Sequence, residues 1–326
     1  MKTIAVIGLG NIARRHRKNL KSRFPEAVII AMSASGRLPT QEVDGADSVL
    51  ANIDELKKAK PEMVIVASPA TFHRQHAVAL IEAGIPVMIE KPVTASLADA
   101  NIVAQTARDN DTPTAVGYCL RYLPSAQKMK QLLDDDLLGS IYNVSVNIGQ
   151  YLPDWRPDKD YRQSVSSQIS LGGGALLELS HEFDYLQWLM GEMKVQYAQL
   201  RTSSELNLEV EELVDIVLTS ESGAVCNVHL DFLQKQVQRK CSFIGMKGRL
   251  DWDLLKNTIS LHTANGTELV YSEPEWDKNN MYLSLLDDFI AQINKEEHHC
   301  IDVMQASQSV ALIEEIKKKA VWGIKQ

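Results

Sequence analysis

Short apolar runs alternate with helical patterns over the first third of the chain. The runs cover residues 3–7, 27–32, 63–67 and 86–89, and hardly a polar residue interrupts them. Helical patterning follows the first run over residues 12–20, and a second helical stretch, 76–83, separates the third run from the fourth. Strands that alternate with helices predict βαβ units and a parallel sheet. We expect this organisation to last to about Gly117.

The pattern then changes from short, continuous apolar runs to strict alternation of apolar and polar residues. Apolar and polar residues alternate in segments 142–148, 214–218 and 226–232, and more weakly near 250–254 and 259–261. Antiparallel sheets with one covered face have this period of two. Around this sheet we expect helices at 124–133, 178–190, 281–293 and 303–320.

A glycine-rich turn follows the first strand directly. Gly8-Leu9-Gly10-Asn11-Ile12-Ala13 fits the pattern G-x-G-x-x-G/A at the start of a helix. Gly8 permits the tight turn, Gly10 lets the backbone approach a pyrophosphate, and Ala13 keeps the helix close to the strand. Together with Asn11 and Ile12, whose N–H groups open the helix, these residues are candidates for binding a dinucleotide. The other interpretation is an ordinary turn between strand and helix.

These patterns predict an α/β fold with two domains. Residues 1–120 form a Rossmann-type, doubly wound parallel sheet, and residues 121–326 form an α+β domain with an open, mostly antiparallel sheet. A length of 326 residues agrees with two domains, because one ordinary core seldom grows so large. The last expected helix, 303–320, could pack against the first domain instead of the second.

Charge and composition narrow the choice of partners. A net charge of −8 without a basic tail argues against nucleic acid. The apolar runs are far shorter than the ~20 residues of a membrane span, and the chain enters its first strand without a signal peptide. Four scattered cysteines indicate neither a metal site nor a disulfide framework, so we expect a cytoplasmic protein. The run Glu296-Glu297-His298-His299-Cys300 is interpreted as a solvated loop, and no metal is expected.

The end of the second strand should decide which nicotinamide cofactor binds. An acidic residue there would hold the ribose 2′-OH of NAD. The sequence instead has Ser33, Ser35 and Arg37, which suit the 2′-phosphate of NADP. We therefore expect NADP in preference to NAD, although Arg37 could also be a plain surface residue.

Further candidates follow the next two parallel strands. Ser68, Pro69 and His73 come after the run 63–67, and Glu90-Lys91-Pro92 comes after the run 86–89. Open α/β sheets bind ligands at the carboxyl ends of their strands, so Ser68, Pro69, His73, Glu90 and Lys91 are expected near the cofactor. Taken alone, Glu90-Lys91-Pro92 could be a strand end with solvated charges.

Four motifs in this order resemble the Gfo/Idh/MocA oxidoreductases, typified by glucose-fructose oxidoreductase and inositol dehydrogenase. They are the Gly8–Ala13 turn, the segment 83–92, Val116-Gly117-Tyr118 and the segment 172–184. The resemblance implies NAD(P)-linked oxidation or reduction of a sugar-like hydroxyl or ketone. It also implies a homo-oligomer, a dimer or tetramer, built through the open sheet. Lys91 matches the family's catalytic lysine, and His181 matches its catalytic histidine.

One family position differs in this chain. The commoner pattern has an Asp four residues before the histidine, and here that residue is Leu177. Glu178, three residues before His181, could share a helix face with it, and we expect Glu178 to take the catalytic role. Glu182 or Asp184 could serve instead, or the role could be absent.

The substrate is expected to contact the segment 151–168. Tyr151, Trp155, Arg156 and Tyr161 combine aromatic faces with charge, as sugar sites do. Arg121, Tyr122 and Asp184 are further candidates for binding the substrate. The segment resembles a branch of the family found among enzymes of surface-sugar synthesis, which implies a sugar nucleotide or an acidic, amino- or deoxy-sugar as substrate. It could also be a surface loop at a subunit contact.

Two other functions stay open from the sequence. One is reduction of a non-sugar substrate such as a diol or a tetrapyrrole. The other is a non-catalytic protein that binds NAD(P) as a sensor on the same scaffold.

Overall fold

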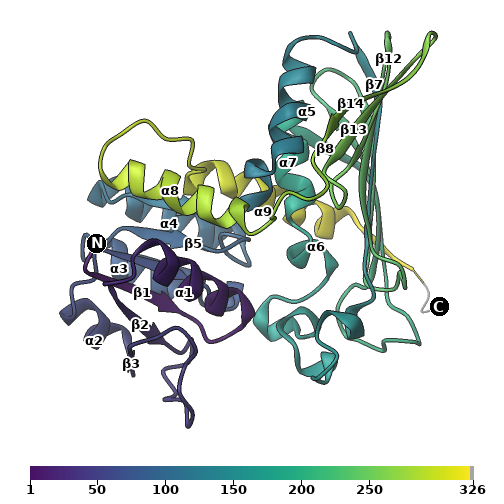
Figure 1. Ribbon diagram of the computed structural model, residues 1–326. Helices are drawn as coiled ribbons and strands as arrows, with labels where there is room; N and C mark the ends of the chain where they lie inside the picture. Colours follow the sequence, from purple (N-terminus) through teal and green to yellow (C-terminus); the bar gives the residue numbers. More distant parts are fainter. Residues whose placement is uncertain (324–326) are drawn as a thin grey trace. The chain divides into compact units, whose positions relative to one another are not determined.

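The computed structural model describes residues 1–323, which form two compact units (Figure 1). The first unit contains residues 1–119 and 279–310, and the second contains residues 120–278 and the chain from 311 onward. The expected domains, 1–120 and 121–326, differ from this division because residues 279–310 group with the first unit. The last three residues of the expected second domain lie outside the described residues.

The first unit is built on a six-stranded parallel sheet in the order β3-β2-β1-β4-β5-β6. This is the strand order of the Rossmann fold. The strands are β1 (Thr3–Ile7), β2 (Val28–Met32), β3 (Ser48–Leu50), β4 (Met63–Val66), β5 (Val87–Ile89) and β6 (Thr114–Val116). The strands β2, β4 and β5 are wholly apolar, as is typical of parallel sheets covered by helices on both faces. The strand order reverses between β1 and β4, where such sheets bind their ligands.

Six helices contribute to this unit. They are α1 (Asn11–Arg23), α2 (Ile53–Lys58), α3 (Ala70–Ile81), α4 (Leu97–Asn110), α8 (Asn280–Ile293) and the first part of α9 (Val303–Lys319). Residues 279–310 belong here because Ile301, Val303 and Val310 lie in the core of the parallel sheet. The carbonyl of Ile301 also accepts a hydrogen bond of 2.9 Å from the N–H of Val116 in β6.

The second unit contains a nine-stranded sheet in the order β14-β13-β12-β11-β7-β10-β9-β8-β15. Its strands are β7 (Ile141–Gly149), β8 (Met193–Arg201), β9 (Leu213–Ser220), β10 (Val225–Asp231), β11 (Gln238–Gly245), β12 (Gly248–Asp253), β13 (Thr258–Thr263), β14 (Gly266–Ser272) and β15 (Val321–Trp322). Most neighbours are antiparallel, but β10 runs parallel to β7 and β15 runs parallel to β8. The mostly antiparallel sheet was expected, whereas β8 and β11 were not among the expected strands.

Helices cover one face of this sheet. Figure 1 shows α5 (Pro124–Asp134), α6 (Ala175–Glu178) and α7 (His181–Met190) on the same side of the strands. The expected helix over 178–190 is confirmed as α7 from His181 to Met190, but its expected start is wrong because Glu178 ends the separate helix α6. Among residues 1–323, no helix is long and apolar enough to cross a membrane.

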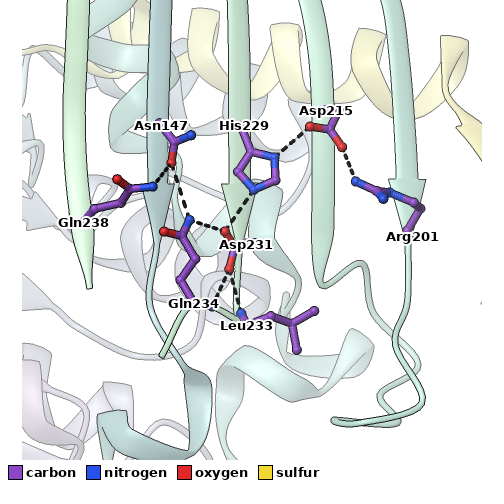
Figure 2. Close-up of polar contacts among 8 residues, drawn as sticks. All are labelled: Asn147, Arg201, Asp215, His229, Asp231, Leu233, Gln234 and Gln238. Atoms are coloured by element: carbon purple, nitrogen blue, oxygen red, sulfur yellow. Dashed lines mark hydrogen bonds and ion pairs between the residues drawn. The ribbon is translucent and has the colours of Figure 1, made fainter. Parts of the chain in front are cut away.

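The other face of the sheet carries a connected polar network (Figure 2). His229 on β10 lies between two carboxylates, with Nδ1 2.7 Å from Asp215 and Nε2 2.9 Å from Asp231. Arg201 pairs with Asp215 at one end, and the Gln234 and Gln238 amides both donate to the Asn147 side chain at the other. The hydrogen bond to Asp231 raises the pKa of His229, against the opposing effect of burial, and Asp215 raises it further.

Candidate active site

The turn between β1 and α1 combines two glycines with different requirements. Gly8 has a φ of +121°, and a Cβ there would lie 2.3 Å from the carbonyl oxygen of Ala67. Only glycine therefore allows the end of β1 to pass so close to the end of β4. Gly10 has an ordinary φ of −75°, and no described atom lies within 4 Å of a Cβ built on it. The chain itself thus leaves open the space beside Gly10.

The start of α1 is suited to an anion. No side chain caps this helix, and its first turn contains no acidic residue. The first N–H groups of the helix, at Asn11, Ile12 and Ala13, have no partner within the helix and carry the positive end of its dipole. Ala13 is fully buried, so the helix packs closely on the strand. The open space at Gly10 and these N–H groups fit the pyrophosphate of a dinucleotide.

Arg17 holds this turn from inside the fold. Its side chain is 2% exposed and donates hydrogen bonds to the carbonyls of Gly8, at 3.0 Å, and Asp44, at 2.8 Å. Burial lowers the pKa of the guanidinium, although Asp44 opposes the shift. Sequence reasoning missed Arg17, yet Ala13, His16, Arg17 and Leu20 share the buried face of α1 at helical spacing.

The loop after β2 presents hydroxyl groups and one cation. The Ser33 and Ser35 hydroxyls lie 3.4 Å apart, and Ser35 and Arg37 are exposed. Within the described chain the Arg37 guanidinium makes neither a hydrogen bond nor an ion pair, and the first carboxylate after β2 is Glu42. Arg37 is therefore available to a ligand.

The loop after β4 is held by a histidine that sequence reasoning did not single out. Nδ1 of His76, on α3, lies 3.1 Å from the hydroxyl of Ser68. Burial lowers the pKa of His76 to about 4, and the neighbouring His73 adds to the shift. His76 is therefore neutral at pH 7. Pro69 caps α3 and offers no side-chain hydrogen bond.

His73, which was expected near the cofactor, is buried and lies against backbone carbonyls of two loops. Its ring is 1% exposed, with Nε2 2.7 Å from the Ser68 carbonyl and Nδ1 3.0 Å from the Pro92 carbonyl. Burial lowers the pKa of His73, and a neutral imidazole has a single N–H, so the ring donates to one of these two carbonyls. His73 instead ties the loop after β4 to the loop after β5, which carries Lys91.

Glu90 also turns inward. One carboxylate oxygen lies 2.6 Å from Nε2 of His16, and the other accepts a hydrogen bond of 3.2 Å from the N–H of Lys91. Burial would raise the pKa of Glu90, but its contacts with His16 and Lys91 outweigh burial and lower it. A Cβ at Gly117 would lie 3.1 Å from the same carboxylate. Glu90 is therefore a positioning residue beneath the partly exposed Lys91.

In the second unit a glycine-rich turn leads to His181. Gly174 has a φ of +107°, and a Cβ there would lie 2.4 Å from the Glu211 carboxylate. Glu211 accepts a hydrogen bond from the N–H of Leu176 and so fixes the start of α6. His181 is the first residue of α7 and is 9% exposed.

Two of the three carboxylates near His181 in sequence form ion pairs with arginines, and the third, Glu178, lies on another helix. Glu182 pairs with Arg239 through both oxygens, and Asp184 pairs with Arg121 in the same way. Burial raises the pKa of Asp184, and Arg121 opposes that shift. Glu178 lies on a different helix from His181, so the argument that they share a helix face is wrong.

The residues expected to contact the substrate lie in the second unit. Tyr122 lies on the short 3-10 turn Cys119–Tyr122, beside Arg121. The Tyr151 hydroxyl donates to Glu205 at 2.9 Å, and Lys235 lies over its ring. Trp155, Arg156 and Tyr161 line a cavity of about 360 Å³ formed by residues 152–166.

The two turn glycines give a test of cofactor binding. Gly8→Ala should lower the melting temperature, because strained backbone of this kind costs about 1–3 kcal/mol and the methyl meets Ala67. Gly10→Ala should leave the melting temperature unchanged and weaken dinucleotide binding about tenfold or more, because the methyl fills the open space. Thermal denaturation and cofactor titration measure the two effects.

Gly84→Ala is the matched control. Gly84 has a φ of +68° but no described atom within 4 Å of its Cβ position, so this variant isolates backbone strain from collision. Wild-type cofactor affinity in Gly10→Ala would contradict placement of the pyrophosphate at this turn.

Comparison with known families and structures agrees with this architecture. Residues 2–118 match the model of the oxidoreductase family with an NAD-binding Rossmann fold, and residues 126–251 match the GFO/IDH/MocA C-terminal domain. The two matches together span most of the chain and both of its units.

Relatives with assigned activities support the same assignment. Inositol 2-dehydrogenase 1 of Saccharopolyspora erythraea is 26% identical over 78% of this chain and 75% of its own length. Glucose-6-phosphate 3-dehydrogenase of Bacillus subtilis is 28% identical over 65% of this chain and 60% of its own length. The WlbA dehydrogenase of Bordetella pertussis, solved with NADH and UDP-GlcNAcA, has a TM-score of 0.81 and 19% identity, covering 98% of this chain and 95% of its own. The chain thus belongs to the GFO/IDH/MocA family of NAD-binding oxidoreductases.

Proposed function

We propose that this protein is a nicotinamide-dependent dehydrogenase that interconverts a hydroxyl and a ketone on a sugar or a polyol. The observation that carries the proposal is that the Gly8–Ala13 turn and Lys91 both follow strands of one parallel sheet at their carboxyl ends. Relatives that act on inositol and on glucose 6-phosphate support this substrate class. A sugar nucleotide is the narrower candidate, in line with the UDP-GlcNAcA bound to WlbA.

The residues of this chain would bind the substrate and move its proton. When bound, the nicotinamide cofactor supplies or accepts the hydride. His181 takes the proton from the hydroxyl as it is oxidised, because histidine changes charge near neutral pH. The Lys91 ammonium is suited to donate a hydrogen bond to a substrate oxygen on which negative charge develops. Glu178 stays our proposal for the acidic partner, because it lies three residues before His181 and its side chain is partly exposed.

Substitution of the two proton-handling residues tests this function. Lys91→Ala and His181→Ala should each lower turnover by about 10²-fold or more, because general acid–base catalysis contributes at least that much. Both variants should still bind the cofactor, since Gly8–Ala13 are unchanged. Absorbance of the reduced cofactor, followed with inositol, sugar phosphates and nucleotide sugars, measures turnover.

His298→Ala is the control, because His298 is exposed on the loop before α9. Near-wild-type turnover in either Lys91→Ala or His181→Ala would remove that residue from the mechanism. Cofactor binding by the wild type without turnover of any hydroxyl or ketone would favour a sensor, and turnover of only diols or tetrapyrroles would favour a non-sugar reductase.

We further propose that the preferred cofactor is NADP. The Ser33 and Ser35 hydroxyls and the unpaired Arg37 occupy the loop where an NAD-specific site would have a carboxylate. Arginine can hold a phosphate through two hydrogen bonds. The neighbouring structure with NADH shows that an NAD-type cofactor suits this fold, so the proposal concerns preference.

Removal of the Arg37 charge tests this preference. The wild type should bind NADPH more tightly than NADH, and Arg37→Gln should abolish most of the difference, about 1–3 kcal/mol for a charge-assisted hydrogen bond. Fluorescence titration with both cofactors measures it, and Arg74→Gln, which changes an exposed arginine on α3, is the control. Equal affinities of the wild type for the two cofactors would overturn the assignment.

We also propose that copies of the chain associate as a homodimer or homotetramer through the sheet face opposite α5 and α7. This face has a shallow hollow of about 330 Å³, lined in part by Tyr197, Val217 and His229. The polar groups around the hollow already bond to one another, so covering them leaves few unsatisfied. When His229 is protonated, the positive charges of Arg201 and His229 equal in number the negative charges of Asp215 and Asp231. The sheet faces of two chains then do not repel each other electrostatically.

A charge placed on this face tests the association. The wild type should have a mass in solution of two or four times the 36.4 kDa of one chain, and Tyr197→Arg should shift the mass toward that of the monomer. Light scattering coupled to size exclusion measures both. Tyr142→Arg is the control, because Tyr142 is also exposed but shares the strand face of the buried Val144. A monomeric wild type would contradict the proposal.

A further inference from the structure

One cavity of the second unit is formed by a single continuous segment. Residues 152–166 fold through the short 3-10 turns Leu152–Trp155, Tyr161–Gln163 and Val165–Ser167, and every residue that lines the cavity comes from this segment. Its volume of about 360 Å³ is within the range of sites for small molecules.

The aromatic walls of this cavity are fixed in place. The Trp155 indole donates to the carbonyl of Gln150 at 3.3 Å, and its ring packs edge-on against Phe232. The Tyr161 hydroxyl donates to the carbonyl of Leu206 at 3.2 Å. Because their polar atoms are already bonded, both side chains offer apolar surface to the cavity, which suits the apolar face of a sugar ring.

The charges around the cavity are not balanced. Arg156 and Lys159 line it, and within residues 1–323 neither side chain has a carboxylate partner or a hydrogen bond. The lining carboxylate, Asp160, accepts a hydrogen bond of 3.0 Å from the N–H of Arg162 and caps the turn Tyr161–Gln163. Among the described residues, Arg156 and Lys159 therefore line the cavity without a partner, whereas Asp160 already accepts a hydrogen bond.

We propose that this cavity binds the anionic group of the substrate, a carboxylate or a phosphate carried by a sugar. Arg156 and Lys159 contact the anion, and Trp155 and Tyr161 pack against the ring. The Ser164 hydroxyl also lines the cavity; it donates to the Ser167 hydroxyl at 3.1 Å and can still accept a hydrogen bond from a sugar hydroxyl. The inference rests on the proposed function and narrows its substrate class from sugars in general to acidic or phosphorylated sugars.

Direct binding to the full chain tests this inference. Calorimetric titrations use methyl glucoside, methyl glucuronide and methyl glucoside 6-phosphate, which share a ring and differ in charge. The reduced cofactor is present, so that the hydroxyls cannot be oxidised. One or both anionic sugars should bind about tenfold or more tightly than the neutral one, because charge-assisted hydrogen bonds are stronger. The tighter of the two anions identifies carboxylate or phosphate as the recognised group.

Arg156→Gln and Lys159→Gln should each weaken binding of the anionic sugar about tenfold and leave methyl glucoside unchanged. Arg162→Gln is the matched control, because Arg162 stacks on Tyr161 and does not line the cavity. Lys159 is exposed, so its variant reports on binding even if Arg156→Gln folds poorly.

Equal affinity for the three sugars, or equal loss in Arg162→Gln, would overturn the inference. Because binding is measured without turnover, the two proposals fail separately. Tighter binding of the anionic sugars without any dehydrogenase activity would contradict only the proposed function. Turnover of sugars without tighter binding of the anionic ones would contradict only this inference.

Discussion

The close approach of the ends of β1 and β4 is the constraint on which the first unit depends. A Cβ at Gly8 would lie 2.3 Å from the Ala67 carbonyl oxygen, so the two strands can end side by side only if residue 8 is glycine. Arg17 then fixes the Gly8 carbonyl from within the fold. His76 and His73 hold the following loop, and His73 links it to the loop of Lys91. The cofactor turn and the lysine are thereby positioned by one connected set of buried groups.

The second unit positions His181 in a different way. Helix α7 carries two buried carboxylates in its first turn, and each pairs with an arginine from another part of the unit. Glu182 is fully buried, and removal of one partner from such a pair typically costs about 3–5 kcal/mol. The two ion pairs therefore fix the orientation of α7, and with it the direction of the His181 side chain.

Five arginines of the chain illustrate two different environments. Arg17, Arg121 and Arg239 are mostly buried and bonded within the protein, where they hold turns and helices in place. Arg37 and Arg156 reach solvent or a cavity without a partner in the described chain. Burial and pairing thus distinguish cations that maintain the fold from cations available to a ligand.

The sequence alone determined the parallel sheet, the mostly antiparallel sheet, the glycine-rich turn Gly8–Ala13 and the family, because each depends on local spacing. Gly8, Gly10 and Ala13 occupy consecutive positions of one turn, and the alternation in 226–232 follows directly from a strand with one buried face. Lys91 and His181 could be singled out because short local motifs surround them.

Tertiary structure decided the features that depend on partners distant in sequence. Glu90 and His73 looked like cofactor ligands, but His16 and the Pro92 carbonyl engage them. The helical pattern over 178–190 hid a break after Glu178, since Leu176, Leu177 and Phe183 are buried on both sides of it. Residues 279–310 joined the first unit because their apolar side chains complete its core. The periodicity of apolar residues indicates which side of a helix or strand is buried. Only the folded structure specifies which neighbouring element that side packs against.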